Sequence, residues 1–291
     1  TYPQFYKMSN GDLLFVYRDG SSGNGNIVLN QYDHKDKKWQ QLHKNLIDGE
    51  GERNAYWQMY LDKKDILHMS WVWRETSDVA TNHDMCYARS MDGGETWQTS
   101  KGQAYSIPVN AKNAEYAMRI PQKSDLINQT SMTADDNSNP YIATYFQGED
   151  DLAPHVYIIY HDGETWSQLR VGQRTLDFDL SGGGTRSIPI SRPIVLHSNH
   201  SGESKLHVIY RDEEYGDKAC MKTIELEHTR DWETTILTEI RLDRWEPSFD
   251  TELWKEKGIL NLFVQRVGQG SGEKAVEMPP TMIRILEIDG L

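Results

Sequence analysis

Three things are scarce in this sequence of 291 residues: cysteine, long apolar runs and net positive charge. The two cysteines, Cys86 and Cys220, give no disulfide framework and so do not fix the compartment, although a single bridge between them stays open. No apolar run approaches the ~20 residues that a membrane-spanning helix needs, so we expect no membrane partner. The net charge of −13 argues against nucleic acid as a partner, and any polyanionic ligand must be met by a local cluster of arginines.

What is present is typical of a globular β protein. Apolar residues make up 37% of the chain and charged residues 26%, and 9 Trp and 15 Tyr supply large, stiff side chains suited to sheet packing. The chain opens at Thr1 without an initiator Met or a basic-then-apolar signal segment. We therefore expect a soluble protein whose natural N-terminus lies upstream of Thr1.

One strand pattern recurs along the whole chain. Each copy is an extended apolar strand that ends in an aromatic or polar pair. Most copies follow a shorter strand and a turn, and each copy is followed by a third strand and a polar turn. This succession is the unit of a propeller blade. We predict an all-β fold, a single β-propeller domain over residues 1–291 built from four-stranded antiparallel blades, with about five blades present. The copies are Leu13–Asp19, Ile66–Glu75, Tyr141–Gly148, Leu206–Asp212 and Ile259–Val267.

Large propellers commonly close with six or seven blades, which is more than this chain supplies. Either the ring is a small one or N-terminal blades are missing. The start at the first strand of a unit favours missing blades.

The segment from Ser90 to Trp97 (SMDGGETW) has the form of an Asp box. An Asp followed by two glycines permits a tight turn whose amides bond the carboxylate, while the Trp packs beneath the blade. Degenerate copies lie at Tyr32 to Trp39 and at Tyr160 to Trp166. We predict a structural role for Asp92, Gly93, Gly94 and Trp97.

The repeated strands place a basic or amide residue at one common position. Guanidinium forks grip carboxylate or sulfate by paired hydrogen bonds, so arginines there would let an acidic protein hold an acidic sugar. The alternative is that some of them pair with Asp19, Glu75 or Asp212 and join the blades together. The position is occupied by Arg18, Arg74, Gln147, Arg211 and Arg266, of which Arg74 and Arg211 are our candidate substrate-binding residues.

Three tyrosines form a further group of candidate site residues. Tyr2, Tyr56 and Tyr60 lie at or before first strands, where a phenol with a lowered pKa could transfer protons beside an arginine; each is otherwise a packing residue.

His68, His83 and Cys86 lie on adjacent predicted strands and could hold a structural zinc, with His83 and Cys86 as the predicted ligands. The alternative is a buried Cys with hydrogen-bonded histidines.

The succession TYPQF, LLFVYRDG, DGEGERNAYWQMY, HMSWVWRE and NHDMCYARSMDGGETW resembles the Asp-box-repeat propellers that include the ulvan lyases of polysaccharide lyase families 24 and 25. The resemblance covers roughly the first half of the chain and continues as repeat rhythm. It implies a seven-bladed propeller that cleaves an anionic, uronate-containing polysaccharide by β-elimination. It also implies a secreted or periplasmic protein, and we expect a monomer that needs no cofactor for catalysis.

Carried onto this chain, the resemblance makes Arg18 the residue that neutralises the uronate carboxylate and Tyr2 the catalytic tyrosine, with Tyr60 as a further substrate contact. The histidines that the family uses lie upstream of Tyr2, so we expect this chain to be catalytically incomplete.

Two other functions compete with the lyase. A sialidase-like glycosidase is suggested by the Asp boxes and by the tetrapeptide MRIP at Met118 to Pro121, although no Tyr/Glu pair stands out. A carbohydrate-binding propeller without chemistry is the third hypothesis, because one fold hosts both.

Overall fold

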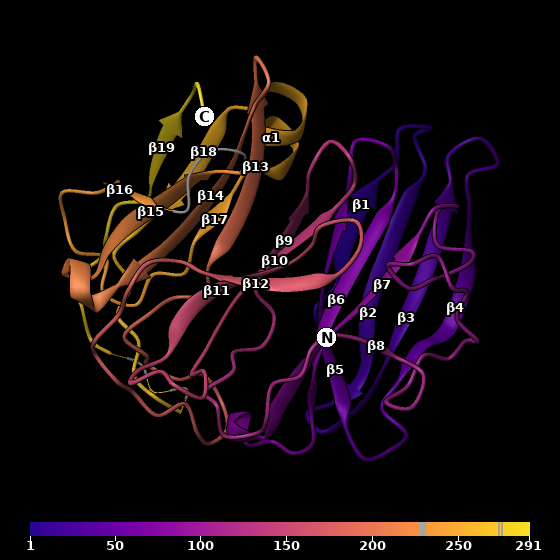
Figure 1. Ribbon diagram of the computed structural model, residues 1–291, viewed down its shortest axis with the longest axis horizontal. Helices are drawn as coiled ribbons and strands as arrows, with labels where there is room; N and C mark the ends of the chain where they lie inside the picture. The colour runs from indigo at the N-terminus through magenta and orange to yellow at the C-terminus, as the bar shows by residue number, and fades with distance from the viewer. Residues whose placement is uncertain (227–230, 273, 275) are drawn as a thin grey trace.

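The computed structural model describes residues 1–226, 231–272, 274 and 276–291. Its strands run antiparallel in successive sheets (Figure 1). The first sheet contains β1 (Gln4–Lys7), β2 (Leu13–Ser21), β3 (Asn24–Asp33) and β4 (Lys38–Asp48), and the second β5 (Asn54–Leu61), β6 (Leu67–Arg74), β7 (Asn82–Ser90) and β8 (Glu115–Met118). One parallel bridge between Gly25 and Asn54 makes these two sets continuous.

The rest of the chain repeats this plan. The third sheet contains β9 (Ser131–Ala134), β10 (Pro140–Phe146), β11 (His155–His161) and β12 (Trp166–Arg170), and the fourth β13 (Ile194–His200), β14 (Glu203–Asp212), β15 (Lys218–Glu225) and β16 (Glu233–Ile236). The fifth, with three strands among the described residues, contains β17 (Ser248–Phe249), β18 (Leu260–Val264) and β19 (Arg284–Ile288). In Figure 1 the first two sheets lie on the right and the fourth and fifth at the upper left.

Helix is scarce in the part of the chain that is described. The short helices are η1 (Val79–Thr81) and η2 (Glu213–Tyr215), and α1 (Thr251–Lys257) begins at an Asp250 cap and ends at Gly258. Within the described residues, no helix is long and apolar enough to cross a membrane.

The second strand of each sheet coincides with one predicted repeat copy, and these strands explain the core. In β2 burial alternates, so Leu14 and Val16 face inward, whereas every residue of β6 and of β10 is buried. Strands buried on both faces require a partner sheet on each side. The all-β class and the four-stranded antiparallel units are therefore confirmed.

The apolar cores lie between neighbouring sheets. Trp57, Trp71 and Trp73 of the second sheet pack with Leu14 and Leu29 of the first. Further clusters join the second sheet to the third, the third to the fourth and the fourth to the fifth. Among the described residues, no sheet covers one face of the first sheet or one face of the fifth. Exposed apolar side chains mark both faces: Phe5 and Trp39 on the first sheet, and Phe263 and Ile285 on the fifth.

The predicted Asp box connects β7 to β8. The Asp92 carboxylate accepts hydrogen bonds from the Thr96 amide (2.9 Å) and from the Thr96 hydroxyl. Gly93 and Gly94 both have positive φ, and the buried Trp97 indole donates to the Gly94 carbonyl at 3.1 Å. The structural role predicted for this turn is confirmed.

Candidate active-site cleft

A cleft of about 610 Å³ opens at one end of a channel that the first strands of the sheets share. Residues of β1, β5, β9, β13 and β17 line the groove next to it, so the sheets converge on a common axis. The cleft lies where loops leave rigid strands, which is where binding residues of such folds collect.

Side chains at corresponding places in the repeat line this cleft. Four of them stand two residues before the first strand of their sheet: Tyr2, Gln129, Arg192 and Glu246. In the second sheet Tyr56 takes the matching place, because Tyr56-Trp57-Gln58 parallels Tyr2-Pro3-Gln4 and both glutamines also line the cleft. Each sheet thus contributes one polar side chain at the same depth.

Tyr56 lies between two guanidinium groups. The Cζ atoms of Arg18 and Arg74 stand 5.2 and 5.1 Å from the centre of its ring, and its hydroxyl is 2.8 Å from the Ser22 hydroxyl. Burial pushes the pKa of Tyr56 upward, but the Ser22 hydroxyl and the two arginines outweigh burial, so this pKa lies below its ordinary value. Of the two tyrosines lining the cleft, Tyr56 is therefore the one that loses its proton more readily.

Tyr2 is the neighbour of Tyr56, with ring centroids 6.0 Å apart and Arg18 Cζ 4.9 Å from the Tyr2 ring. The side chain is more exposed than that of Tyr56, and its backbone is left-handed, with φ 56°. Burial raises the pKa of Tyr2, with Tyr56 adding to the effect, although Arg18, Arg192 and Arg74 oppose it. Tyr2 is accordingly the phenol of the pair that keeps its proton to higher pH.

The two predicted arginines beside these phenols are both buried, and of the two Arg74 lines the cleft. Arg18 is 5% exposed; its Nε donates to the Thr1 hydroxyl at 2.9 Å, and its Nη1 has no hydrogen-bond partner. Arg74 ends β6, lines the cleft and donates to the carbonyls of Thr76 and Ser77. The structure thus brings Tyr2, Arg18, Tyr56 and Arg74 together.

Arg211 has a different setting. It is 1% exposed and donates to the Asp217 carboxylate (3.0 Å) and to the carbonyls of Ile188, Pro189 and Trp245. Its atoms form part of the cleft wall, but its donors are used. The predicted substrate contact stays a prediction, and the geometry suits a positioning role.

The other predicted residues lie away from the cleft. Tyr60 lines the deeper channel, where burial raises its pKa. Arg266 is half exposed and pairs with Asp243, and Gln147 donates to the Asp151 carbonyl. The predicted ring of arginines is therefore divided between cleft, core and surface.

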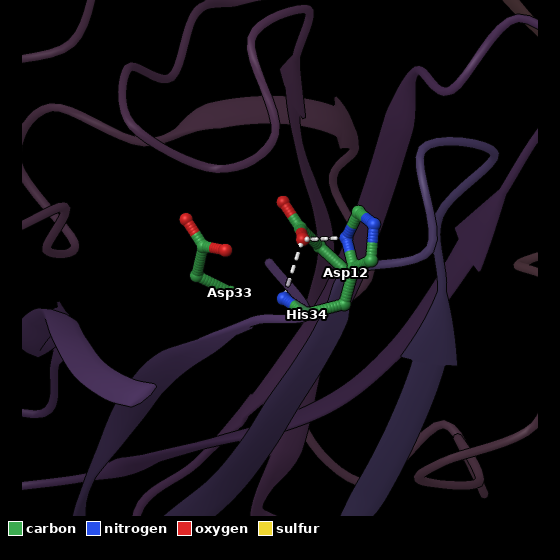
Figure 2. A group of neighbouring side chains, drawn as sticks. All are labelled: Asp12, Asp33 and His34. Carbon is green, nitrogen blue, oxygen red and sulfur yellow. Dashed lines mark hydrogen bonds and ion pairs between the residues drawn. The ribbon is translucent and has the colours of Figure 1, made fainter. Parts of the chain in front are cut away.

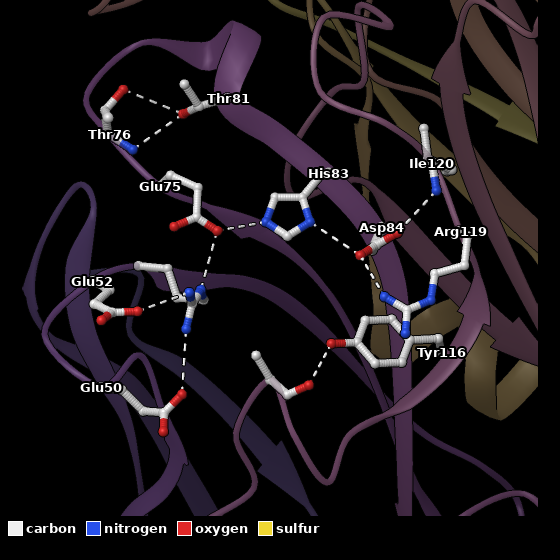
Figure 3. Close-up of polar contacts among 12 residues, drawn as sticks. Glu50, Glu52, Glu75, Thr76, Thr81, His83, Asp84, Tyr116, Arg119 and Ile120 are labelled. Carbon is white, nitrogen blue, oxygen red and sulfur yellow. Dashed lines mark hydrogen bonds and ion pairs between the residues drawn. The ribbon is translucent and has the colours of Figure 1, made fainter.

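The predicted zinc ligands are not gathered with a third ligand in the described residues. His83 donates toward Asp84 at 3.0 Å and Glu75 at 2.7 Å, in a network that continues through Arg119 on one side and Arg53 on the other (Figure 3). Cys86 is fully buried, and burial raises the pKa of its thiol. His68 bonds the Tyr87 hydroxyl. A zinc at His83 and Cys86 stays a prediction that would require His83 to leave a carboxylate.

A different trio, Asp12, Asp33 and His34, has ligand atoms within 4.8 Å of one another (Figure 2). The Asp12 carboxylate already accepts from the His34 amide and ring and from Asn10 and Gln31. These hydrogen bonds stabilise the turns between the strands and account for the closeness of the three side chains.

Local charge in the cleft is strongly positive although the protein is acidic. Its lining residues include Glu246 as the carboxylate and these arginines: Arg74, Arg186, Arg192, Arg211 and Arg244. Such a site attracts anions, and the two phenols beside it can move a proton.

Several cleft residues were not among the candidates. Gln129, Arg192 and Glu246 occupy the same position in their sheets but differ in residue type. Their chain neighbours offered a clue: Tyr2, Arg192 and Glu246 are each followed by a proline and then by a first strand.

Comparison with known proteins agrees with this architecture. The chain is 30% identical over 142 residues to the short isoform of an ulvan lyase from Alteromonas sp. (strain LOR), over 45% of this chain and 26% of that protein. A solved polysaccharide lyase matches with TM-score 0.62 and 18% identity, over 99% of this chain and 58% of its own. A solved ulvan lyase of polysaccharide lyase family 25 matches with TM-score 0.61 and 13% identity, over 90% and 61%.

The chain thus spans about a quarter of that curated relative and about three fifths of the two solved structures. The predicted resemblance to ulvan lyases is confirmed. A family model described as a BNR repeat-containing family member matches residues 1–174. With more than half of its length matched, the chain belongs to the BNR repeat-containing family.

Proposed function

We propose that this chain carries the cleft of a polysaccharide lyase that cleaves an anionic, uronate-containing polysaccharide, similar to ulvan, by β-elimination. The observation that supports this proposal is the placement of Tyr56 between Arg18 and Arg74, next to Tyr2. Elimination needs a cation at the uronate carboxylate and proton transfer at carbon and at oxygen. The relatives named ulvan lyases support the same reaction.

In this proposal the phenolate of Tyr56 removes the C5 proton of the uronate, because its pKa is the one that is lowered. The electron pair of the C5–H bond forms the C4–C5 double bond as the C4–O bond breaks. Tyr2, whose pKa is raised, donates its proton to the leaving oxygen. The charge of Arg18, with that of Arg74 at the cleft wall, offsets the charge of the carboxylate, which stabilises the enolate-like intermediate.

The test is ultraviolet absorbance of the unsaturated uronyl product, recorded with ulvan and other polyuronates on a longer form of the protein that supplies the remaining blades. Tyr56→Phe and Arg18→Gln should each lower kcat/KM by about 100-fold or more, since each removes a proton-transfer or charge-stabilising group. Arg266→Gln, which removes an exposed guanidinium outside the cleft, should leave the rate within about twofold. An unchanged rate in Arg18→Gln would contradict the assignment.

A glycosidase of the sialidase type is the second candidate, because Glu246 shares the cleft with two tyrosines and several arginines. Hydrolysis would release reducing ends without new ultraviolet absorbance. A binding module would release neither product and still retain the sugar.

We further propose that the sheets belong to a seven-bladed ring completed by blades outside this chain. The uncovered faces of the first and fifth sheets, and the three-fifths coverage of the solved lyases, support it. A polymer too large to cross a membrane must be cut where it lies, so we place the protein outside the cytoplasm, in the medium or the periplasm, as a monomer. Small-angle scattering of a longer form would test the ring.

A further inference from the structure

Glu246 is the one carboxylate among the described residues lining the cleft, and it faces Arg192. Its Oε2 accepts a hydrogen bond from the Arg192 amide at 3.0 Å and lies 3.6 Å from the Arg192 Nη1 atom. The side chains of Glu246 and Arg192 keep 41% and 38% of their surface exposed, so a ligand can reach both. An anion that binds Arg192 must therefore compete with Glu246.

The neighbouring polar groups do not compete strongly for the contact between Arg192 and Glu246. The Arg192 Nε donates to the Asn128 carbonyl at 3.1 Å, which directs the other nitrogens toward the cleft. Arg211 also lies within electrostatic reach of Glu246, but it is committed to Asp217 and to backbone carbonyls. Behind them Tyr145 of β10 is fully buried.

We propose that Glu246 is an internal competitor for Arg192: its carboxylate takes the place of a ligand anion and gives it up when an anionic sugar group binds or when the carboxylate takes up a proton. This inference rests on the proposed function insofar as the natural ligand is an anionic sugar. Glu246 acts through Arg192 and is a specificity residue, not a catalytic one.

The direction of the pH effect follows from the geometry. Desolvation in the narrow cleft raises the pKa of Glu246, although Arg192 and Arg211 oppose it. Protonation removes both the attraction for Arg192 and the repulsion of an incoming anion, so anion affinity should rise as the pH falls. The other ionisable groups near Glu246 do not titrate between about pH 5 and about pH 7. The arginines stay protonated, and Tyr145 stays neutral because burial raises its pKa.

The experiment is calorimetric titration with two probes, inorganic sulfate and an oligoglucuronate, at about pH 7 and about pH 5, where sulfate keeps its charge. The wild type should bind sulfate more tightly at the lower pH, by no more than the factor that Glu246→Gln gains at the higher pH. Glu246→Gln keeps an acceptor for the Arg192 amide and should bind about tenfold more tightly than wild type at the higher pH, with no pH dependence. The control Glu233→Gln removes one charge from exposed β16, outside the cleft, and should behave as wild type.

Arg192→Gln separates competition from a merely structural effect. In that background Glu246→Gln should give a clearly smaller gain, because only the direct repulsion of the anion is left to remove once Arg192 is gone. Sulfate binding that is absent, or that is the same in wild type and Glu246→Gln at both pH values, would overturn the inference. If sulfate binding depends on pH as expected but the oligoglucuronate does not bind, the inference about Glu246 is supported and the proposed substrate is contradicted.

Discussion

At the scale of the residue, neighbours decide what each side chain can do. Tyr2 and Tyr56 occupy matching places in the repeat, yet the pKa of one is raised and that of the other lowered. Two guanidinium groups flank the ring of Tyr56, whereas Tyr2 has one within cation–π distance. Two phenols with displaced pKa values suit a reaction that needs both a base and an acid.

The arginines of the common strand position give the clearest residue-scale prediction. Arg211→Ala should lower the free energy of unfolding by about 3 kcal/mol or more, because three carbonyls in the core lose a charged donor and a buried side chain is removed, although Asp217 keeps Arg241 and Arg244. Arg266→Ala breaks a half-exposed pair and should cost about 1 kcal/mol or less. Urea unfolding of both variants measures the difference, and equal costs would contradict the separate roles.

A glycine pair in the turn from β4 to β5 provides a second residue-scale test. A Cβ at Gly49 would lie 1.8 Å from the Arg53 carbonyl oxygen, which also belongs to the turn, so Gly49→Ala should cost about 3 kcal/mol. Gly51→Ala meets no atom within 4 Å and should cost about 1 kcal/mol, from its positive φ alone. Thermal unfolding of the two variants checks the order, and a Gly49→Ala protein as stable as Gly51→Ala would refute the close approach.

At the scale of the element, side-chain pairs across strands join the sheets internally. His207 of β14 is 2% exposed and bonds Ser198 of β13 (2.8 Å) and Thr223 of β15 (2.9 Å). Burial lowers the pKa of His207 to about 4. The ring is therefore neutral in the folded state near neutral pH.

This burial makes the fourth sheet sensitive to acid. The unfolded state takes up the proton below its ordinary pKa of about 6.5, while the folded state resists until about 4, so stability falls as the pH drops through that interval. The loss should reach about 2.5 kcal/mol near pH 4.5. Urea unfolding at neutral and acidic pH should show this loss in wild type and in the exposed control His200→Gln, but a smaller loss in His207→Gln. Identical pH profiles in all three proteins would count against the buried neutral ring.

At the scale of the whole molecule, charge and apolar surface are distributed unevenly. A chain of net charge −13 gathers arginines in one cleft, so attraction for a polyanion is local and should weaken with salt. The uncovered face of the first sheet gathers stacked aromatic rings, including Phe5 on Phe15 at 4.7 Å.

That aromatic face predicts how the 291-residue chain behaves on its own. Phe5→Ser with Trp39→Ser should reduce binding of a hydrophobic dye by about half, because both side chains belong to one exposed patch. Met91→Ser removes an equally exposed but isolated side chain and should change dye fluorescence little. If both proteins bound the dye alike, the patch would not be the binding surface.

The sequence by itself determined the repeating units, because strand alternation and turn chemistry are local: the apolar copies became second strands, and Ser90 to Trp97 formed the expected turn. The resemblance of the sequence to the ulvan lyases also selected Tyr2 and Arg18 as a pair, and these two side chains lie together in the structure. Only the tertiary structure decided that Tyr56 and not Tyr60 joins them, that Arg211 is committed to the core, and that Glu246 faces Arg192. Position in the repeat fixes the depth of a side chain, whereas its partners come from sheets distant in the chain.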